Sequence, residues 1–564
     1  MSALLALVSG LALAMALPQA IPWLSLRPID PAGHLEWLAW IGLVPALLAL
    51  DRARSWRGAL GLGMAAGLAY FYAAIWWVNH AMTAFGGVPL GLALIGLSLL
   101  VLHGAVHWAA AFAASWTIRR RLGWPWWSHL PAVWVATELS RNYLFTGFPW
   151  ADLGYLQARH LTVAQLASVT GVYGIAGLVV LVNCVLAACL QAILARRAPP
   201  WRLAGAAALV VAAVVAYGTL HLRTVRARVA AAPSLRVALV QGNVNQAVKN
   251  EGRRYAERIL ERYVPLTVEA DRLGADLVAW PEAAYPYLVP PGLTSLAGRG
   301  PGLAPLHRAH LLLGAVVVRD RRAEGGGAEE GANSVLLLRP DLTVAGRYAK
   351  HHLVPFGEYV PLPWLLGGVL RSVVPLMLPQ QPGSALRVLV LDPGPGRGPP
   401  VRVAPMICFD AIFPEVNVAY AAQDPDLLLN PTNDAWYGYS SGPYQFLSMV
   451  AMRAIEAGRA VARPAYAGIT AVIDPTGEVR PGALPVGPVD PDLAPDPEEP
   501  PRLLIAEVPR LRGRTLYTTF GDLFAGAATA YAVTALAAAL LRRRGGAPPE
   551  GAGTGPWPHR PPSS

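Results

Sequence analysis

The chain has 564 residues, of which 54% are hydrophobic and 14% charged, and its mean hydropathy is +0.39. This balance excludes an ordinary soluble protein and predicts membrane spans. Arginines beside the apolar runs carry the formal net charge of +11, which favours membrane anchoring and does not support nucleic-acid binding.

Eight apolar runs approach or exceed the length that crosses about 30 Å of hydrocarbon as a helix. They lie near residues 2–26, 36–50, 58–79, 87–115, 125–140, 164–195, 203–220 and 521–541. The sequence therefore predicts an N-terminal membrane domain of about seven helices over 1–222 and one more transmembrane helix at 521–541. The stretch 1–20 could instead be a cleaved signal peptide, although it lacks a basic start and further spans follow it.

Arginine clusters predict the orientation of these spans. With a cytoplasmic N-terminus, the cytoplasmic loops hold the arginines of 52–57, 119–121, 196–202 and 542–544, as the positive-inside rule requires. The exception is the group Arg223, Arg226 and Arg228, which this orientation leaves outside. The long region after residue 233 is then also expected outside the cytoplasm.

Residues 233–513 change to short β-rich runs that alternate with helical stretches and Gly/Pro turns, a pattern typical of a layered α/β domain. Helices are expected at 252–273 and 442–460. Strands are expected at 235–242, 276–280, 311–318, 334–339, 387–392, 401–408, 426–430, 467–474 and 503–508. Several of these strands are apolar on both faces, which indicates a sheet covered on both sides.

Two further segments differ from the α/β pattern. Segment 360–384 is apolar and interrupted by prolines, which fits either a core helix with a long loop or a lid that dips into the bilayer and admits a lipid chain. The composition of residues 545–564 predicts a disordered tail.

Three polar residues follow strands or extended segments, where α/β folds tend to place their sites. They are Glu282 after DLVAWP, Lys350 in GRYAKHHLVPFGEYVP and Cys408 at the end of VRVAPMIC. Together they suffice for acyl transfer, because a thiol can attack a carbonyl, a carboxylate can remove its proton and an ammonium can stabilise the oxyanion. Each residue alone is more often structural, and a single Cys after an apolar strand is usually a small core residue.

In this order and context, the three residues resemble the Glu–Lys–Cys triad of the nitrilase, or carbon–nitrogen hydrolase, superfamily. The resemblance covers roughly 235–510 and implies an αββα sandwich. The sequence segments 346–361, 433–459 and 131–155 resemble the apolipoprotein N-acyltransferase family in particular. The last of them lies outside the hydrolase region, and a soluble amidase would have no reason to carry it.

That resemblance implies a two-step reaction on the periplasmic side of a bacterial inner membrane. Cys408 would take an acyl chain from a phospholipid and pass it from a thioester to the amine of a diacylglyceryl-cysteine apolipoprotein. We expect a multi-pass monomer that uses no cofactor and no metal. His103 and His107 share a helical face, but no third ligand accompanies them.

The resemblance also assigns supporting residues. Glu358 matches a second Glu that supports the Lys, while Phe409 and Asp410 stand where the family usually has Tyr and Glu. Asn250 and Tyr466 are further departures from the family pattern, and these changes bear on how substrate is positioned. Substrate-binding candidates are Tyr359, Trp364, Trp436, Glu138 and Arg141, of which the last two would pair with each other or line a headgroup site.

Two alternatives remain from the sequence. A membrane-tethered amidase or nitrile hydrolase would use the same triad with water as the acceptor. A non-catalytic lipoprotein-binding paralogue would explain the altered residues Phe409 and Asp410.

Overall fold

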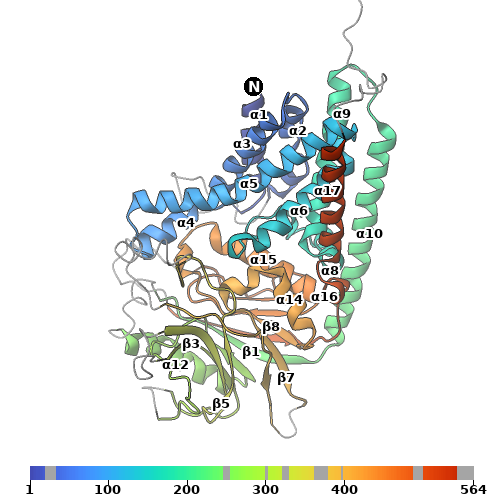
Figure 1. The fold of residues 1–564 in the computed structure, drawn as a ribbon. Helices are drawn as coiled ribbons and strands as arrows, with labels where there is room; N and C mark the ends of the chain where they lie inside the picture. The colour runs from blue at the N-terminus through green and yellow to red at the C-terminus, as the bar shows by residue number, and fades with distance from the viewer. Residues whose placement is uncertain are drawn as a thin grey trace, which may run out of the picture.

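The computed structural model describes residues 1–18, 34–244, 255–298, 303–319, 330–360, 379–394, 398–486 and 500–542. A bundle of helices stands on an α/β domain, and both ends of the described chain lie in the bundle (Figure 1). Trp364, Asn250, most of segment 360–384 and the predicted tail at 545–564 lie outside the described residues.

The helical part runs from Ser2 to Ala231. Its main helices are α1 (Ser2–Met15), α2 (Val44–Asp51), α3 (Trp56–Ala74), α5 (Leu90–Leu122), α6 (Trp126–Tyr143), α9 (Val172–Leu194) and α10 (Trp201–Ala231), with short pieces at α4 (Trp77–His80), α7 (Leu161–Ala164) and α8 (Ala167–Thr170). Helix α17 (Leu523–Leu541) returns from the far end of the chain and packs on α5 and α6. Helix α10 runs down the outside of the bundle toward the first strand (Figure 1).

The described residues contain fewer full-length spans than the eight predicted runs. Among the described residues, α5, α9, α10 and α17 are long and apolar enough to cross a membrane, and α3 with the following residues 77–84 forms a fifth candidate bent by 51°. In the described part of the first predicted run the helix has 14 residues, and the α-helix of the second run has 8. The run 164–195 is interrupted at Gly171, whose φ of +64° ends α8 before α9 begins. Several apolar runs therefore form short or broken helices within a multi-pass bundle.

The α/β domain contains two sheets. One has the order β11-β1-β2-β3-β4-β5 and the other β10-β9-β8-β7-β6. The strands are β1 (Ser234–Gln241), β2 (Leu277–Ala279), β3 (His310–Arg319), β4 (Glu330–Leu338), β5 (Val344–Ala349), β6 (Leu389–Leu391), β7 (Val401–Pro405), β8 (Leu427–Leu429), β9 (Val461–Arg463), β10 (Ala471–Ile473) and β11 (Arg502–Pro509).

Helices cover the outer faces of both sheets. Helix α12 (Ala256–Arg272) lies on the first sheet, whereas α14 (Pro414–Ala421) and α15 (Gly442–Ala457) lie between the second sheet and the bundle (Figure 1). Strand β1 shows the resulting alternation, because Val237 and Leu239 join the core between the sheets while Ala238 and Val240 join the core under α12. The predicted αββα sandwich is confirmed.

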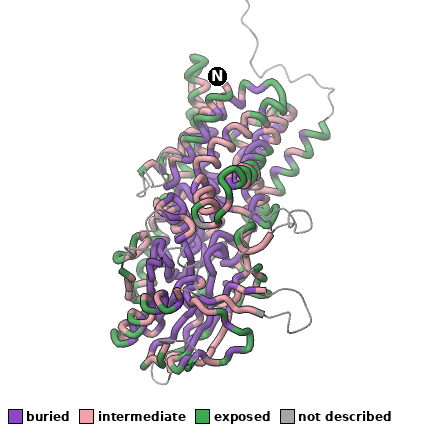
Figure 2. Tube along the Cα trace, turned by 90° about the vertical axis from the view of Figure 1, so that its left-hand side faces the viewer, coloured by how far each residue is buried: buried purple, intermediate pink, exposed green. Residues whose placement is uncertain are grey.

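The bundle and the sandwich share one core. Buried residues fill the sandwich and continue upward into the helices (Figure 2), and a single hydrophobic cluster includes residues of α3, α6, α9 and α15. At this junction Gln445 of α15 uses both ends of its side chain. Its Oε1 accepts hydrogen bonds from the indoles of Trp77 (3.3 Å) and Trp150 (2.8 Å), and its Nε2 donates to the carbonyls of Pro18 and Ala74, both at 3.0 Å.

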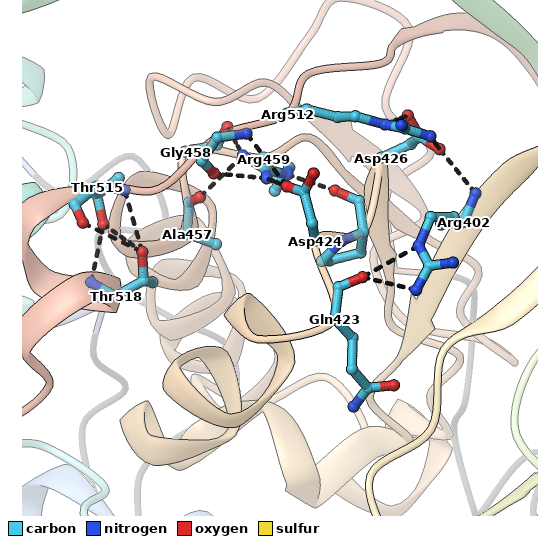
Figure 3. A network of polar contacts seen from close by, with 12 residues as sticks. Arg402, Gln423, Asp424, Asp426, Ala457, Gly458, Arg459, Arg512, Thr515 and Thr518 are labelled. Atoms are coloured by element: carbon cyan, nitrogen blue, oxygen red, sulfur yellow. Dashed lines mark hydrogen bonds and ion pairs between the residues drawn. The ribbon is translucent and has the colours of Figure 1, made fainter.

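A second polar network ties the C-terminal helices to the sandwich (Figure 3). Arg459, two residues after α15, donates to Asp424 Oδ1 (2.8 Å) and to the Gly513 carbonyl (2.6 Å). Thr515 Oγ1 donates to the Glu456 carbonyl (2.6 Å) and also accepts from Thr518 N (3.0 Å), which caps α16 (Leu516–Phe520). The start of α17 is therefore fixed relative to the sandwich.

Candidate active site

The structure brings the three predicted triad residues together at the ends of strands from both sheets. Glu282 follows β2, Lys350 directly follows β5, and Cys408 follows β7 at the start of the 3-10 turn η5 (Cys408–Ile412). Lys350 Nζ lies 2.9 Å from Glu282 Oε1. The charges of Glu282 and Lys350 both act on the Cys408 thiol, and the three side chains are buried.

Cys408 has a backbone conformation that is rare for its residue type. Its φ is +45°, in the left-handed region, and Ala283, next to Glu282, has a φ of +46°. Such backbone costs of the order of 1–3 kcal/mol and persists where the surroundings fix it. The surroundings fix the backbone of Cys408, because its N–H donates to the Pro431 carbonyl (2.9 Å) and the residue is only 6% exposed. The strained turn presents the sulfur at the end of β7.

The Lys350 ammonium is held between two carboxylates. Glu358 Oε1 lies 2.9 Å from Nζ, as Glu282 Oε1 does. Asn333 Nδ2 donates to both carboxylates, at 2.6 Å to Glu282 and 3.1 Å to Glu358. Burial alone would lower the pKa of Lys350, but the negative charges of Glu282 and Glu358 outweigh it and hold the pKa well above its usual value. Lys350 therefore stays an ammonium.

Asp410 connects the segment after Lys350 to the turn at Cys408. Its carboxylate accepts hydrogen bonds from Tyr348 Oη (2.8 Å) and from the backbone N–H groups of His351 (3.1 Å), His352 (2.7 Å) and Ile407 (3.0 Å). Burial raises the pKa of Asp410 to about 6, although these donors and Lys350 oppose the shift. This side chain therefore fixes the spacing between the ammonium and the thiol.

Known proteins match both halves of the chain. The family model of the apolipoprotein N-acyltransferase N-terminal domain matches residues 9–185, and that of the carbon-nitrogen hydrolases matches residues 236–485. The apolipoprotein N-acyltransferase of Geobacter metallireducens is 35% identical over 545 residues, which are 96% of this chain and 95% of the relative. That of Azotobacter vinelandii is 34% identical over 526 residues, or 92% and 94%.

The chain belongs to the apolipoprotein N-acyltransferase family. It is thus an N-acyltransferase of lipoprotein biosynthesis, and its apolar helices make it a multi-pass membrane protein. A solved mutant amidase of the nitrilase superfamily from Nesterenkonia is 20% identical, with a TM-score of 0.31 over 49% of this chain and 90% of that chain.

The two departures from the usual family pattern beside the cysteine are both accommodated. Phe409 is 6% exposed, and its ring packs edge-on against Phe413 at a centroid distance of 5.3 Å. Phe413 in turn stacks on His352 at 3.9 Å. Phe409 therefore packs as an apolar side chain, and Asp410 accepts four hydrogen bonds despite its shorter side chain.

The predicted substrate-binding residues lie in different surroundings. Tyr359 Oη donates to Thr146 Oγ1 (3.2 Å), which links the segment after Lys350 to the bundle. Trp436 is partly buried in the 3-10 turn η6 (Asp434–Tyr437), against the core under α12.

The polar pair of α6 is buried rather than open to a lipid. Arg141 forms its ion pair with Asp152, not with Glu138, because the chain after α6 folds back over the helix. Glu138 Oε1 instead accepts from Trp134 Nε1 and Leu153 N, both at 2.9 Å. Glu138 and Arg141 are 4% and 2% exposed, so this arrangement favours a structural role, and their role in substrate binding stays a prediction.

Several polar residues around the triad were not predicted from the sequence. Besides Asn333, these include Asn433, whose N–H donates to Glu282 Oε2 (3.0 Å), and Thr432, which hydrogen-bonds Asp434 Oδ1 (3.0 Å). Asp434 is paired with the buried Arg463 at 2.8 Å. The run PTND at 431–434 directly follows the predicted strand DLLLN, and this concentration of polar residues at a strand end was an available signal.

The resting nucleophile is a neutral thiol. Burial raises the pKa of Cys408 to about 12, the Glu282 carboxylate adds to the rise, and Lys350 and a hydrogen bond with Thr432 oppose it. Ionisation of this sulfur therefore requires that its proton move to a nearby base as the reaction proceeds.

Alkylation of Cys408 by iodoacetamide is expected to become about tenfold faster per pH unit from pH 7 to 9, because the thiolate fraction grows tenfold per unit below a pKa of about 12. Peptide mapping by mass spectrometry measures the rate at Cys408, with Cys189 as an internal comparison. A rate that levels off near pH 7 would contradict the expectation, since it would mean that Lys350 already holds a thiolate.

Proposed function

We propose that this protein transfers a fatty acyl chain from a phospholipid to the N-terminal amine of a diacylglyceryl-cysteine apolipoprotein through a thioester on Cys408. The observation that carries the proposal is the buried contact of Lys350 with Glu282 beside the Cys408 thiol. A base, an oxyanion donor and a nucleophile are thereby assembled at one point.

In the first step Cys408 Sγ attacks the ester carbonyl of the phospholipid while Glu282 accepts the thiol proton. The negative charge that develops on the carbonyl oxygen lies near the Lys350 ammonium, which stabilises it. The tetrahedral intermediate collapses by breaking the bond to the glycerol oxygen. Glu282 returns the proton to that oxygen, so a lysophospholipid leaves and the acyl chain remains on sulfur.

In the second step the α-amine of the lipoprotein attacks the thioester carbonyl. Glu282 accepts a proton from the amine, the carbon–sulfur bond breaks, and the proton is returned to Cys408 as the amide leaves. A buried site suits this sequence, because an amine attacks a thioester readily while little water is admitted to compete.

Glu358 and Asn333 act through Lys350 and Glu282. Glu358 is itself fixed by the N–H of Val354, which donates to its Oε2 at 2.8 Å, and Asn333 bridges the two carboxylates. Together with Lys350 and the N–H of Asn433, these donors fix both carboxylates around the ammonium. We infer that these residues position the base and the oxyanion donor.

We also infer that different parts of the chain anchor the enzyme and carry out the reaction. Residues 1–222 and 521–541 would hold the enzyme in the bacterial inner membrane, and residues 233–513 would act on its periplasmic side as a monomer. The arginine distribution supports this orientation, and the contact of Tyr359 with Thr146 supports a site that meets the bundle.

Incubation of the purified protein with an acyl-labelled phospholipid and a diacylglyceryl-cysteine peptide tests the proposal. The expected products are equal amounts of N-acylated peptide and lysophospholipid, measured by mass spectrometry. A peptide with an acetylated amine is the control and should release no lysophospholipid beyond one equivalent per enzyme. Free fatty acid without acylated peptide would contradict the proposal and indicate a membrane-tethered hydrolase.

A further inference from the structure

Two adjoining cavities open beside the junction of the bundle and the sandwich. One, of about 450 Å³, lies along α15 and is mostly apolar, with Leu447, Ala451, Ile469 and Leu484 in its wall. The other, of about 510 Å³, lies between the end of α10 and the loop before α7. Arg159 and Leu161 line both. The described lining residues include no member of the triad, so the cavities are separate from the active site.

The second cavity presents two guanidinium groups and an imidazole to solvent. Arg159, His160 and Arg226 line it, with side chains 33%, 51% and 54% exposed. The carboxylate that pairs with the first two, Glu36, is only 7% exposed. Arg226 pairs across to Glu478 of the apolar cavity at 3.0 Å, and both of these side chains are about half exposed. The exposed pair of Arg226 with Glu478 holds weakly. A guanidinium carries five N–H donors, so Arg159 and Arg226 can each also donate to a phosphate, for which they are suited.

The same cavity contains a buried acceptor without a hydrogen bond. Gln157 is fully buried and lines the cavity. Its Nε2 donates to the carbonyls of Glu36 (3.2 Å) and Leu156 (3.1 Å), whereas its Oε1 has no hydrogen-bond partner. A buried polar atom in this state costs free energy unless a ligand or water satisfies it. The cavity thus offers cationic donors for an anion and one acceptor for an N–H or O–H group.

We propose that these cavities bind a phospholipid as a second lipid site, apart from the acyl donor in the active site. The phosphate lies between Arg159 and Arg226, the headgroup ammonium or hydroxyl donates to Gln157 Oε1, and an acyl chain occupies the apolar cavity along α15. Trp40 and Leu222, which also line the polar cavity, suit the glycerol region. Charge complementarity and the adjoining apolar space together favour a lipid over a free anion.

The site also accounts for an exception in the sequence. Arg223, Arg226 and Arg228 depart from the charge distribution expected outside the cytoplasm, and Arg226 lines the polar cavity at the end of α10. Binding of a lipid phosphate would explain why a positively charged residue occupies this position.

Photocrosslinking of the Cys408→Ala protein in nanodiscs tests the proposal. The probe is phosphatidylethanolamine with a diazirine in one acyl chain, in a phosphatidylglycerol background, and the labelled peptides are identified by mass spectrometry. We expect label on the peptides that contain Leu447 and Ile469. The double variant Arg159→Gln/Arg226→Gln should reduce this label at least about fivefold. Arg223→Gln, on the same helix but outside the cavity lining, should leave it unchanged.

A second variant shows whether a loss of label comes from loss of the site or from misfolding of the protein. Leu484→Trp fills part of the apolar cavity without changing charge and should also reduce the label, while the thermal unfolding temperature shows that the protein is intact. Equal labelling in wild type and in the double variant would overturn the proposal. Suppression of the label by inorganic phosphate alone would also overturn it, since the site would then bind a free anion. Acylation of the peptide, measured separately with Cys408 present, is independent of either result.

Discussion

Replacement of Cys408 by alanine or serine is expected to abolish the acyl-enzyme and to lower N-acylation by about 10³-fold or more. Alanine removes the nucleophile. Serine keeps a hydroxyl, but its proton is far less acidic than that of a thiol, and the alkoxide is a poorer leaving group in the second step. Intact-protein mass spectrometry after incubation with phospholipid measures the acyl adduct, and the peptide assay measures turnover.

The matched control is Cys184→Ala. Cys184 lies in α9, is 2% exposed and belongs to the core of the bundle, so its replacement should leave both the adduct and turnover at the wild-type level. An acyl adduct that persists in Cys408→Ala and disappears in Cys184→Ala would remove Cys408 from the mechanism.

Replacement of Lys350 by arginine is expected to lower turnover by about 10²- to 10³-fold even though the positive charge is kept. Nζ lies 2.9 Å from both Glu282 and Glu358 in a fully enclosed position. A guanidinium is larger and directs its donors in a fixed fork, so it cannot occupy this point and also face the oxyanion. The rate of peptide acylation at saturating phospholipid measures the effect.

Lys350→Met should be more severe in stability as well as in rate. It leaves Glu282 and Glu358 facing each other without a cation, and truncation of one side of a buried ion pair costs about 3–5 kcal/mol. The thermal unfolding temperature in detergent should fall accordingly. Arg347→Lys, on the same strand, is the control for a change of basic side chain and should behave as wild type. Normal turnover in Lys350→Arg would exclude an oxyanion role for Lys350.

The parts of the fold that could be predicted from the sequence are those in which apolar residues recur at helical or strand spacing. The expected helix at 442–460 is α15, and the expected strands at 235–242 and 503–508 are β1 and β11. Two strands were missed. β5 is a half-buried edge strand with the sequence VAGRYA, so it lacks a hydrophobic pattern. β9 has three residues and ends in Arg463, whose burial is possible only because Asp434 pairs with it.

The candidate site was predictable where residue type and strand end coincide. Glu282, Lys350 and Cys408 were selected as candidates in this way, together with the family resemblance, and the structure brings them together. Asn333 could not be found, because it lies within an apolar strand and acquires its contacts only when β4 and β5 pair. The partner of Arg141 was also misjudged, since a spacing of three residues favours Glu138 while Asp152 comes from a segment that returns to the helix.

The contacts of Gln445 limit how this enzyme can be divided. Four hydrogen bonds connect this one side chain to three separate segments of the bundle, and the neighbouring ring of Phe446 packs against Trp150. A chain cut before β1 would leave this amide and its aromatic neighbours facing water. The hydrolase-like half is therefore not an independent soluble module, and recombinant work should keep the lipid-facing helices attached.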